Sequence, residues 1–171
     1  MPHDLPKRRR CSVRLQGFNY AQPGAYFITV VTHGRVCHFG NVADGVVRLS
    51  DAGRVVEGWW EELSRRFPTV TPDERIVMPN HFHGIAIIGE SRPNGDLLPE
   101  EGQPHRAAPT LADIVGWFKT MITNEYIRGV KSYGWQPFVG RLWQRNYHEH
   151  IIRHDGDLFL KRRYIQDNPA Q

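Results

Sequence analysis

The chain has 171 residues, a formal net charge of +4 at pH 7 and a pI near 9.3. Its 40% hydrophobic and 23% charged residues are the proportions of one globular domain. Its apolar runs are far shorter than the roughly 20 residues that a membrane-spanning helix needs, so we expect no membrane-spanning helix. Two cysteines, Cys11 and Cys37, are too few for a disulfide framework, so we expect a reduced, cytoplasmic protein.

Basic residues are grouped near both ends of the sequence. Residues 1–12 form a basic arm, without the apolar core of a secretory signal, and a second group lies at 161–163. Aromatic residues accompany basic ones in residues 142–153. Cations interleaved with aromatics are typical of proteins that bind single-stranded nucleic acids, although solvated charges beside core aromatics give the same pattern. The basic residues of the arm are Lys7, Arg8, Arg9 and Arg10.

The first half of the chain predicts two strands and a helix. Residues 24–34 alternate aromatic and β-branched positions and predict a central strand, and residues 45–50 predict a short second strand. A helix then follows, capped by Ser50 or Asp51 and ended by Pro68. Its apolar residues recur at steps of three and four and predict one buried stripe of Val55, Val56, Trp59, Trp60 and Leu63.

The middle of the chain predicts two further strands and a loop. The strand-like runs at 75–78 and 81–88 are separated by Pro79 and Asn80, which should bend the backbone. Residues 90–110 lack periodicity and are rich in proline, glycine and acidic residues. We expect them to be a surface loop within one domain rather than a boundary between two domains.

The last third predicts a helix, a strand and a helix. The first of these helices begins at Thr110, where Asp113 three residues later resembles a capping box. Residues 141–153 predict the last strand, and Asp155 should cap a final helix. The connections are too short for a doubly wound sheet. The order of elements therefore predicts an α+β protein with an antiparallel sheet and helices on one or both of its faces.

Two histidines at the start of the 81–88 strand are the first candidates for chemistry. Residues two apart on a strand point to the same face, so His81 and His83 should project side by side while Phe82 points into the core. This is a suitable geometry for two ligands of one divalent metal. Two histidines that are only hydrogen-bonded or exposed would give the same local pattern.

The sequence offers two sources for a further metal ligand. His148 and His150 form a second pair of the same spacing, and a four-histidine site would favour zinc. The final helix instead offers Tyr164 and Asn168, which lie one turn apart on one face. An amide oxygen suits Mg²⁺ or Mn²⁺, and the tyrosine hydroxyl would then lie beside the metal. In the alternative interpretation, Tyr164 packs and Asn168 only caps the helix.

Four segments in order along the chain carry a resemblance to a known family. They are VMPNHFHGIAI, IVGWFKTMITNEY, WQRNYHEHIIR and YIQDNP. From about residue 13 to its end, the chain resembles the single-tyrosine HUH transposases, and more closely the REP-associated tyrosine transposases. The resemblance implies a ferredoxin-like antiparallel sheet with helices packed on it.

The resemblance also implies roles for four residues. His81 and His83 would bind a divalent metal, Mg²⁺ or Mn²⁺, and Asn168 would complete its site. Tyr164 would be the nucleophile. The asparagine matches the REP-associated branch, whereas the mobile insertion-sequence enzymes typically have glutamine there.

The implied function is that of a metal-dependent single-strand DNA endonuclease and strand transferase. It would act on hairpin-forming repeats through a covalent 5′-phosphotyrosine intermediate, as a monomer or a homodimer at the nucleoid. One alternative is a DNA hairpin-binding protein with little or no cleavage activity. Another is a zinc hydrolase that uses both histidine pairs.

Several other residues compete for these roles or could contact DNA. Tyr126 and Tyr147 are alternative nucleophiles, although neither lies one helical turn before an amide ligand. His148 and His150 could support the metal site, contact DNA or be structural. Three basic residues join the N-terminal arm as candidate phosphate contacts: Lys119, Arg145 and Arg153.

Overall fold

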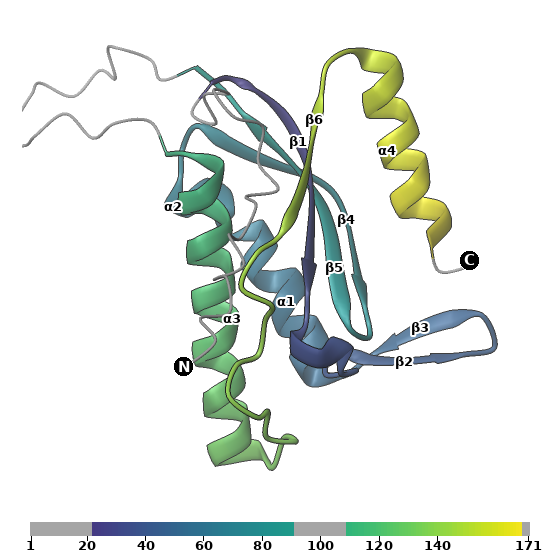
Figure 1. Ribbon diagram of the computed structural model, residues 1–171, viewed down its shortest axis with the longest axis vertical. Helices are drawn as coiled ribbons and strands as arrows, with labels where there is room; N and C mark the ends of the chain where they lie inside the picture. Colours follow the sequence, from purple (N-terminus) through teal and green to yellow (C-terminus); the bar gives the residue numbers. More distant parts are fainter. Residues whose placement is uncertain (1–21, 91–108, 169–171) are drawn as a thin grey trace, which may run out of the picture.

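The computed structural model describes residues 22–90 and 109–168 of the chain (Figure 1). The predicted basic arm with Lys7, Arg8, Arg9 and Arg10 lies outside the described residues, as do residues 91–108 of the predicted loop. Among the described helices, none combines the length and the apolar composition needed to cross a bilayer.

A four-stranded sheet is the centre of the molecule. It contains β1 (Gly24–Val31), β4 (Val70–Met78), β5 (His81–Ile88) and β6 (His148–Ile152). Their order across the sheet is β4-β5-β1-β6, and every neighbouring pair is antiparallel. The central position predicted for the strand within residues 24–34 is confirmed, since β1 lies between β5 and β6.

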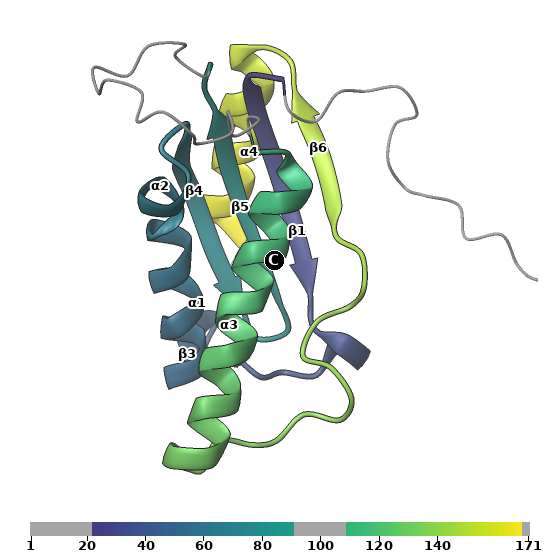
Figure 2. The same ribbon diagram turned by 90° about the vertical axis from the view of Figure 1, so that its left-hand side faces the viewer.

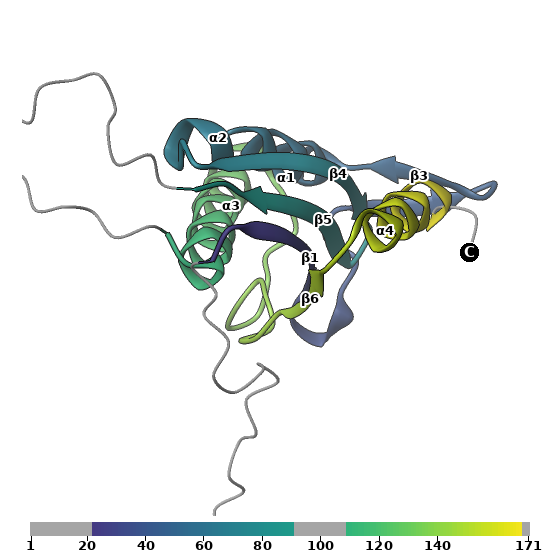
Figure 3. The same ribbon diagram turned by 90° about the horizontal axis from the view of Figure 1, so that it is seen from above.

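Helices cover both faces of this sheet. The face covered by α1 (Asp51–Glu61) and α3 (Leu111–Tyr133) is opposite the face on which α4 (Asp155–Asp167) lies (Figures 2 and 3). A single turn, α2 (Leu63–Arg66), follows α1. The order strand, α1, strand, strand, α3, strand is the ferredoxin-like arrangement, so the predicted α+β class is confirmed.

The main core lies between the sheet and the pair α1 and α3. The rings of Trp60, Phe82 and Phe118 meet at its centre, with centroids 4.8–5.3 Å apart. Gly84 allows this close packing, because a Cβ atom there would lie 2.7 Å from the rings of Trp60 and Phe82. The predicted helix is divided into α1 and α2, but the centre of its buried stripe is confirmed, since Val56 and Trp60 on α1 and Leu63 on α2 are at most 1% exposed. Val55 and Trp59, at its margin, are only partly buried.

The ends of the helices follow their caps. The Ser50 side chain accepts a hydrogen bond from the Gly53 amide and begins α1, as predicted. Thr110 and Asp113 form a complete capping box at the start of α3, so aspartate here replaces the usual glutamate. The prediction that Asp155 caps the final helix is wrong by one residue. The N-cap is His154, whose Nδ1 accepts from the Asp157 amide.

Two strand predictions are also corrected. The predicted strand at 45–50 is β3 (Val46–Leu49), but it pairs with an unpredicted strand, β2 (Gly40–Ala43). Asp44 and Gly45 join them with φ of 54° and 72°, the backbone of a tight hairpin turn. The last predicted strand, 141–153, is ordered as a strand only in β6. In the predicted part before β6, one isolated antiparallel bridge joins Trp143 to Thr32, the residue that follows β1.

Candidate active site

His81 and His83 lie on the face of β5 that α4 covers. Antiparallel pairing places His83 opposite Thr29 and His81 opposite Val31, while Phe82 points into the main core and is fully buried. The two imidazole centroids are 4.7 Å apart. The side-by-side projection expected from the strand period is therefore confirmed.

Hydrogen bonds orient both imidazoles. The Asn80 side chain donates from Nδ2 to the Arg35 carbonyl at 3.3 Å, which turns its Oδ1 toward His81 Nδ1 at 2.7 Å. An amide oxygen can only accept, so His81 carries its proton on Nδ1 and keeps the lone pair of Nε2 for another partner. His83 Nδ1 lies 2.8 Å from Thr29 Oγ1. Such contacts to the second nitrogen are how proteins orient histidine ligands of metals.

Burial keeps both histidines neutral. The pKa of His83, which is only 6% exposed, is lowered from 6.5 to about 4 by desolvation and then by the neighbouring His81. Desolvation also lowers the pKa of His81, with a smaller effect from the Arg35 charge. Because a metal binds the neutral imidazole, both side chains are in the right protonation state near pH 7.

Tyr164 reaches this pair from α4. Its ring packs edge-on against His83, with centroids 5.5 Å apart, and against Phe27 at 5.8 Å. Tyr164 is 42% exposed, so the residue is accessible to a polymer substrate. The fold thus brings Tyr164 beside the histidine pair, although it lies 164 − 83 = 81 residues after His83 in the sequence.

Asn168 lies one turn beyond Tyr164, at the C-cap of α4, where its amide N–H bonds to the Ile165 carbonyl. No hydrogen bond joins its side chain to either histidine within the described part of the chain. Its role as a metal ligand therefore stays a prediction. The capping position and a ligand role are compatible, because the cap uses the backbone of Asn168 and leaves its amide group available.

Two kinds of contact hold α4 on the sheet. An apolar cluster of Phe27, Ile85, Ile152 and Ile165 lies between them. Beside it, the guanidinium of Arg162 donates to the Asp73 carboxylate, from Nε to both oxygens at 3.1 and 3.3 Å and from a terminal nitrogen to Oδ2. One turn further, Gln166 donates to Glu74 at 3.2 Å. These two polar contacts flank Tyr164 in sequence and fix the rotation of the helix.

The second histidine pair has a different role. His150 Nε2 lies 2.8 Å from Asp157 Oδ2 and so ties the first turn of α4 to β6. His148 is exposed on the same strand. Because β1 lies between β5 and β6, the two pairs are two sheet spacings apart, about 10 Å. Within residues 22–90 and 109–168, no group of three or more His, Cys, Asp or Glu side chains could hold a metal, so the four-histidine zinc site is wrong.

The alternative nucleophiles are packing residues. Tyr126 is 2% exposed in the core of the opposite face, and its hydroxyl donates to the Gln136 carbonyl. Burial raises its pKa, which makes it a poorer nucleophile. Tyr147 is half-buried and packs on the same core. Of the three candidate tyrosines, only Tyr164 lies beside the histidines.

The candidate phosphate contacts are in different environments. Lys119 is half-buried on α3, and its Nζ donates to the carbonyls of Gln144 at 2.6 Å and Arg145 at 3.3 Å. Desolvation lowers its pKa to about 8. It therefore has a clear structural role in holding the segment before β6. Arg145 and Arg153 are exposed, and their contact with DNA stays a prediction.

Sequence reasoning missed Arg35 and Asn80. Arg35 ends a short 3-10 turn, η1 (His33–Arg35), with a left-handed φ of 56° that is rare for a residue other than glycine. Its charge is near enough to lower the pKa of His81, and its guanidinium has no ion pair among the described residues. No sequence pattern indicated a role for Arg35. The bend at Pro79 and Asn80, just before the histidines, was predicted, but not the contact of Asn80 with His81.

Comparison with known structures defines the class of fold. No protein family model matches the chain. A solved structure of a REP-associated tyrosine transposase bound to a REP hairpin has a TM-score of 0.60 and 18% identity, and the match covers 92% of this chain and 73% of that one. A Deinococcus radiodurans structure covers 94% of this chain and 100% of that one at 13% identity, but its TM-score of 0.48 supports no argument. The chain has the fold of the REP-associated tyrosine transposases.

Sequence comparison defines the family. A Haemophilus influenzae protein described as uncharacterized is 35% identical over 169 residues, which is 94% of this chain and 88% of that protein. The chain belongs to the same family as this Haemophilus protein.

Proposed function

We propose that this protein is a metal-dependent single-strand DNA endonuclease and strand transferase that acts on hairpin-forming repeats. The single observation that carries the proposal is the position of Tyr164, with its ring against His83 and its face open to solvent. The solved structure with the same fold is of a REP-associated tyrosine transposase bound to a REP hairpin, which supports hairpin DNA as the substrate.

The donor set fits a hard divalent cation of the Mg²⁺ or Mn²⁺ class. His81 and His83 would supply two neutral nitrogens, and Asn168 would supply an amide oxygen. With these three protein ligands, the cation would still be able to take phosphate oxygens of the DNA. When bound, the metal would stabilise the negative charge that develops on the scissile phosphate.

The reaction at Tyr164 exchanges one phosphoester for another. Its Oη attacks the phosphorus and loses its proton to water, the bond from phosphorus to the 3′ oxygen breaks, and that oxygen leaves as a 3′-hydroxyl. The product is a 5′-phosphotyrosine. Because the bond energy is conserved, a 3′-hydroxyl of another strand can reverse the step without ATP. His83 and Phe27 position the ring.

The test uses hairpin DNA with single-stranded flanks, Mn²⁺ and the whole protein. A covalent adduct should form that survives denaturation, and Tyr164→Phe should abolish it. Tyr133→Phe is a matched control, since Tyr133 is an exposed tyrosine on α3 and the adduct should be unchanged. An adduct that persists in Tyr164→Phe would show that the nucleophile is another residue. Tight hairpin binding without an adduct, across several metals and repeats, would identify a binding protein instead.

Metal binding is tested separately from cleavage. Calorimetric titration of Mn²⁺ should show binding by the unmodified protein, a loss for His81→Ala and His83→Ala larger than the roughly 10- to 100-fold that removing an outer-shell partner costs, and a smaller loss for Asn168→Ala. Equal affinity in Asn168→Ala would remove that residue from the site.

A further inference from the structure

The ring of Phe27 is where three polar side chains of the candidate active site meet. His83 stacks on this ring with centroids 5.3 Å apart and an interplanar angle of 23°, and Tyr164 meets it edge-on at 5.8 Å. The third group is the ammonium of Lys161, whose Nζ lies 5.2 Å from the centroid of the same ring. A positive charge is therefore present beside both the candidate nucleophile and the buried histidine.

The helix period explains the position of Lys161. It precedes Tyr164 by three residues and Asn168 by seven, so the three side chains lie along one stripe of α4. On the sheet, Phe27 and His83 belong to successive rows of the same face. The stripe thus has a candidate metal ligand at one end, the candidate nucleophile in the middle and a cation at the other end.

The charge of Lys161 is not used by any ion pair within the described part of the chain. Asp157, one turn earlier on α4, is the nearest carboxylate along the stripe, but its Oδ2 lies 2.8 Å from His150 Nε2. The hydrogen bond from His150 is the largest cause that lowers the pKa of Asp157, and the charge of Lys161 is the smallest. A phenyl ring is a weaker partner for an ammonium than an anionic oxygen, so Lys161 can leave Phe27 for a phosphate.

The two arginines that follow Lys161 are used for structure. Arg162 is bound to Asp73 on β4, and Arg163 is paired with Asp167 on its own helix. Of the basic group at 161–163, Lys161 is thus the member that lies beside Tyr164 and keeps its charge available.

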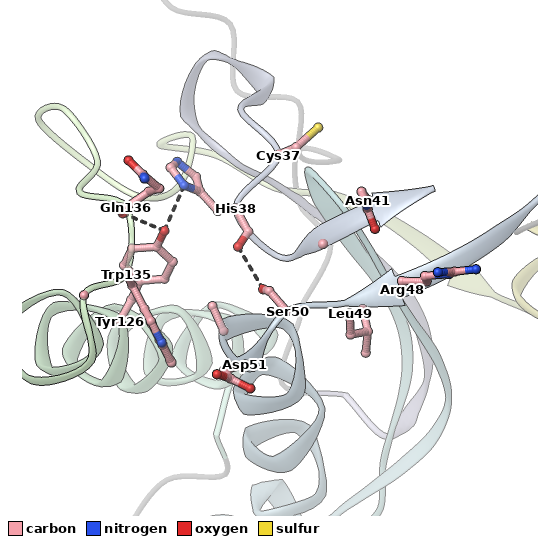
Figure 4. Close-up of a pocket in the computed structure, with 13 residues that line it drawn as sticks. Cys37, His38, Asn41, Arg48, Leu49, Ser50, Asp51, Tyr126, Trp135 and Gln136 are labelled. Carbon is pink, nitrogen blue, oxygen red and sulfur yellow. Dashed lines mark hydrogen bonds between the residues drawn. The ribbon is translucent and has the colours of Figure 1, made fainter. Parts of the chain in front are cut away.

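A cavity of about 570 Å³ on another part of the described structure does not supply a cation to Tyr164. Its walls come from the segment before β2, from the β2–β3 hairpin, from the start of α1 and from the end of α3 (Figure 4). The arginine in its wall, Arg48, contacts Asp44 at 3.5 Å. The ring contacts of Tyr164 are with Phe27 and His83, and neither lines the cavity. A cation for the nucleophile therefore has to come from the α4 face.

The proposed reaction has a use for such a cation. Negative charge increases on both nonbridging oxygens of the scissile phosphate as Tyr164 attacks, and positive groups held beside a transferring phosphoryl group stabilise it. Arg35 lies near His81, on the side of the candidate metal ligands, because its charge lowers the pKa of that histidine after desolvation. Lys161 is the cation on the side of the nucleophile.

We infer that Lys161 is a further catalytic residue, whose ammonium donates a hydrogen bond to a nonbridging oxygen of the scissile phosphate and keeps its proton throughout the reaction. The inference rests on the proposed function. It assigns to one member of the basic group at 161–163 the stabilisation of charge in the reaction, separately from any role of that group in holding the helix.

The first experiment measures the contact without cleavage. Tyr164→Phe protein is bound, in the presence of a chelator, to hairpin DNA with single-stranded flanks in which one phosphate at a time is replaced by an uncharged methylphosphonate. One position should weaken binding several-fold. In the double variant with Lys161→Met, which keeps an unbranched stem on Phe27 but has no charge, that penalty should disappear and the others should be unchanged. Lys131→Met, which removes an exposed lysine from α3, is the matched control and should leave every penalty as it was.

The second experiment measures the rate of adduct formation in a single turnover with saturating DNA and Mn²⁺. Lys161→Met should lower the rate constant about 100-fold, the size of effect that follows loss of one donor to developing negative charge. Lys161→Arg should restore most of the rate, and Lys131→Met should not change it. The midpoint of urea denaturation should be the same in Lys161→Met and the unmodified protein, because the stem still covers Phe27.

The outcomes separate this inference from the proposed function. If no methylphosphonate penalty depends on Lys161, or if the dependent phosphate is not the one that is cleaved, the catalytic role of Lys161 is overturned even though the Tyr164 adduct forms. An unchanged rate in Lys161→Met also overturns it. A slower rate with a lower urea midpoint and no phosphate-specific penalty would show that Lys161 only packs the helix. If the penalty depends on Lys161 but no metal gives an adduct, the nuclease and the catalytic role both fail and only the phosphate contact remains.

Discussion

On one face of the sheet, α1 and α3 bury a continuous apolar core with Trp60, Phe82 and Phe118 at its centre. On the other face, α4 covers a cluster of only four buried apolar residues. The remaining area there contains the two histidines, Tyr164 and a row of polar contacts. The same strands form both faces, since alternate residues of β5 point to opposite sides.

The difference between the two faces suggests a division of roles: the face under α1 and α3 stabilises the fold, and the face under α4 contains the candidate catalytic residues. Apolar burial is the dominant favourable contribution to folding, so the α1 and α3 face, with the larger core, should contribute more to the stability of the fold. The α4 face can then contain desolvated histidines that weaken it. Changes on the first face should alter unfolding, and changes on the second should mainly alter metal binding and DNA cleavage.

The largest expected effect compares neighbours on β5. Phe82→Ala should lower the free energy of unfolding by about 3–5 kcal/mol, because a fully buried ring in the main core is removed. Ile85→Ala, in the cluster under α4, should cost about 2 kcal/mol, because the helix above it can settle into the space. Urea denaturation followed by tryptophan fluorescence measures both. Equal costs would show that the two faces are equally important for stability.

The second effect is the pH dependence of the metal-free protein. The fold lowers the pKa of His83 from 6.5 to about 4, so as the pH falls the unfolded chain binds this proton first. Stability should be constant above pH 6.5 and decrease between pH 6.5 and 4, by on the order of 3 kcal/mol from this residue.

Denaturation at several pH values in the presence of a chelator measures this dependence. His83→Gln removes the titrating group and should give a flatter profile, although His81 contributes in the same direction. If the profiles of the two proteins are parallel, the burial of His83 does not control acid stability.

The sequence predicted the parts of this molecule that depend on local pattern. The alternation in β5 correctly predicted that His81 and His83 share a face and that Phe82 is buried. The one-turn spacing of Tyr164 and Asn168 predicts one face for both, and the ligand role of Asn168 stays a prediction. That Tyr164 meets His83 could be expected only from the family resemblance, because no local rule relates two segments so far apart in sequence.

The parts that sequence did not predict depend on long-range contacts. The role of Arg35 follows from a turn that packs on the β4–β5 loop, and the role of His150 follows from its contact with Asp157. Lys119 has the sequence features of a phosphate ligand but donates to two backbone carbonyls. Each of these depends on which surfaces meet in the folded chain.

The third effect tests how α4 is positioned. Arg162→Ala leaves the Asp73 carboxylate, which is 15% exposed, without its partner. We expect a loss of about 1 kcal/mol in stability. We also expect about a tenfold slower adduct formation, because small displacements of a nucleophile are costly to rate. Single-turnover kinetics should show a lower rate constant with unchanged DNA affinity.

Arg163 is the matched control for this prediction. It is the next residue on the same helix, and its partner is the exposed Asp167 at 3.5 Å. Arg163→Ala should change neither stability nor rate, and Arg162→Lys should restore part of the rate. An equal effect of both alanine variants would indicate loss of general positive charge near DNA rather than loss of helix position.

The smallest effect compares the first turns of the two long helices on opposite faces. Thr110→Ala removes a full capping box from α3 and should cost about 1 kcal/mol. The cap of α4 is His154, whose ring nitrogen is a weaker cap than a hydroxyl, so His154→Ser should change stability by less than about 0.5 kcal/mol, in the favourable direction. Urea titrations measure both changes.

Adduct formation should be unchanged in His154→Ser, because Tyr164 is positioned by contacts in the second half of α4. A slower rate in this variant would mean that the first turn also positions the nucleophile, and the His150 contact to Asp157 would then be the next residue pair to vary.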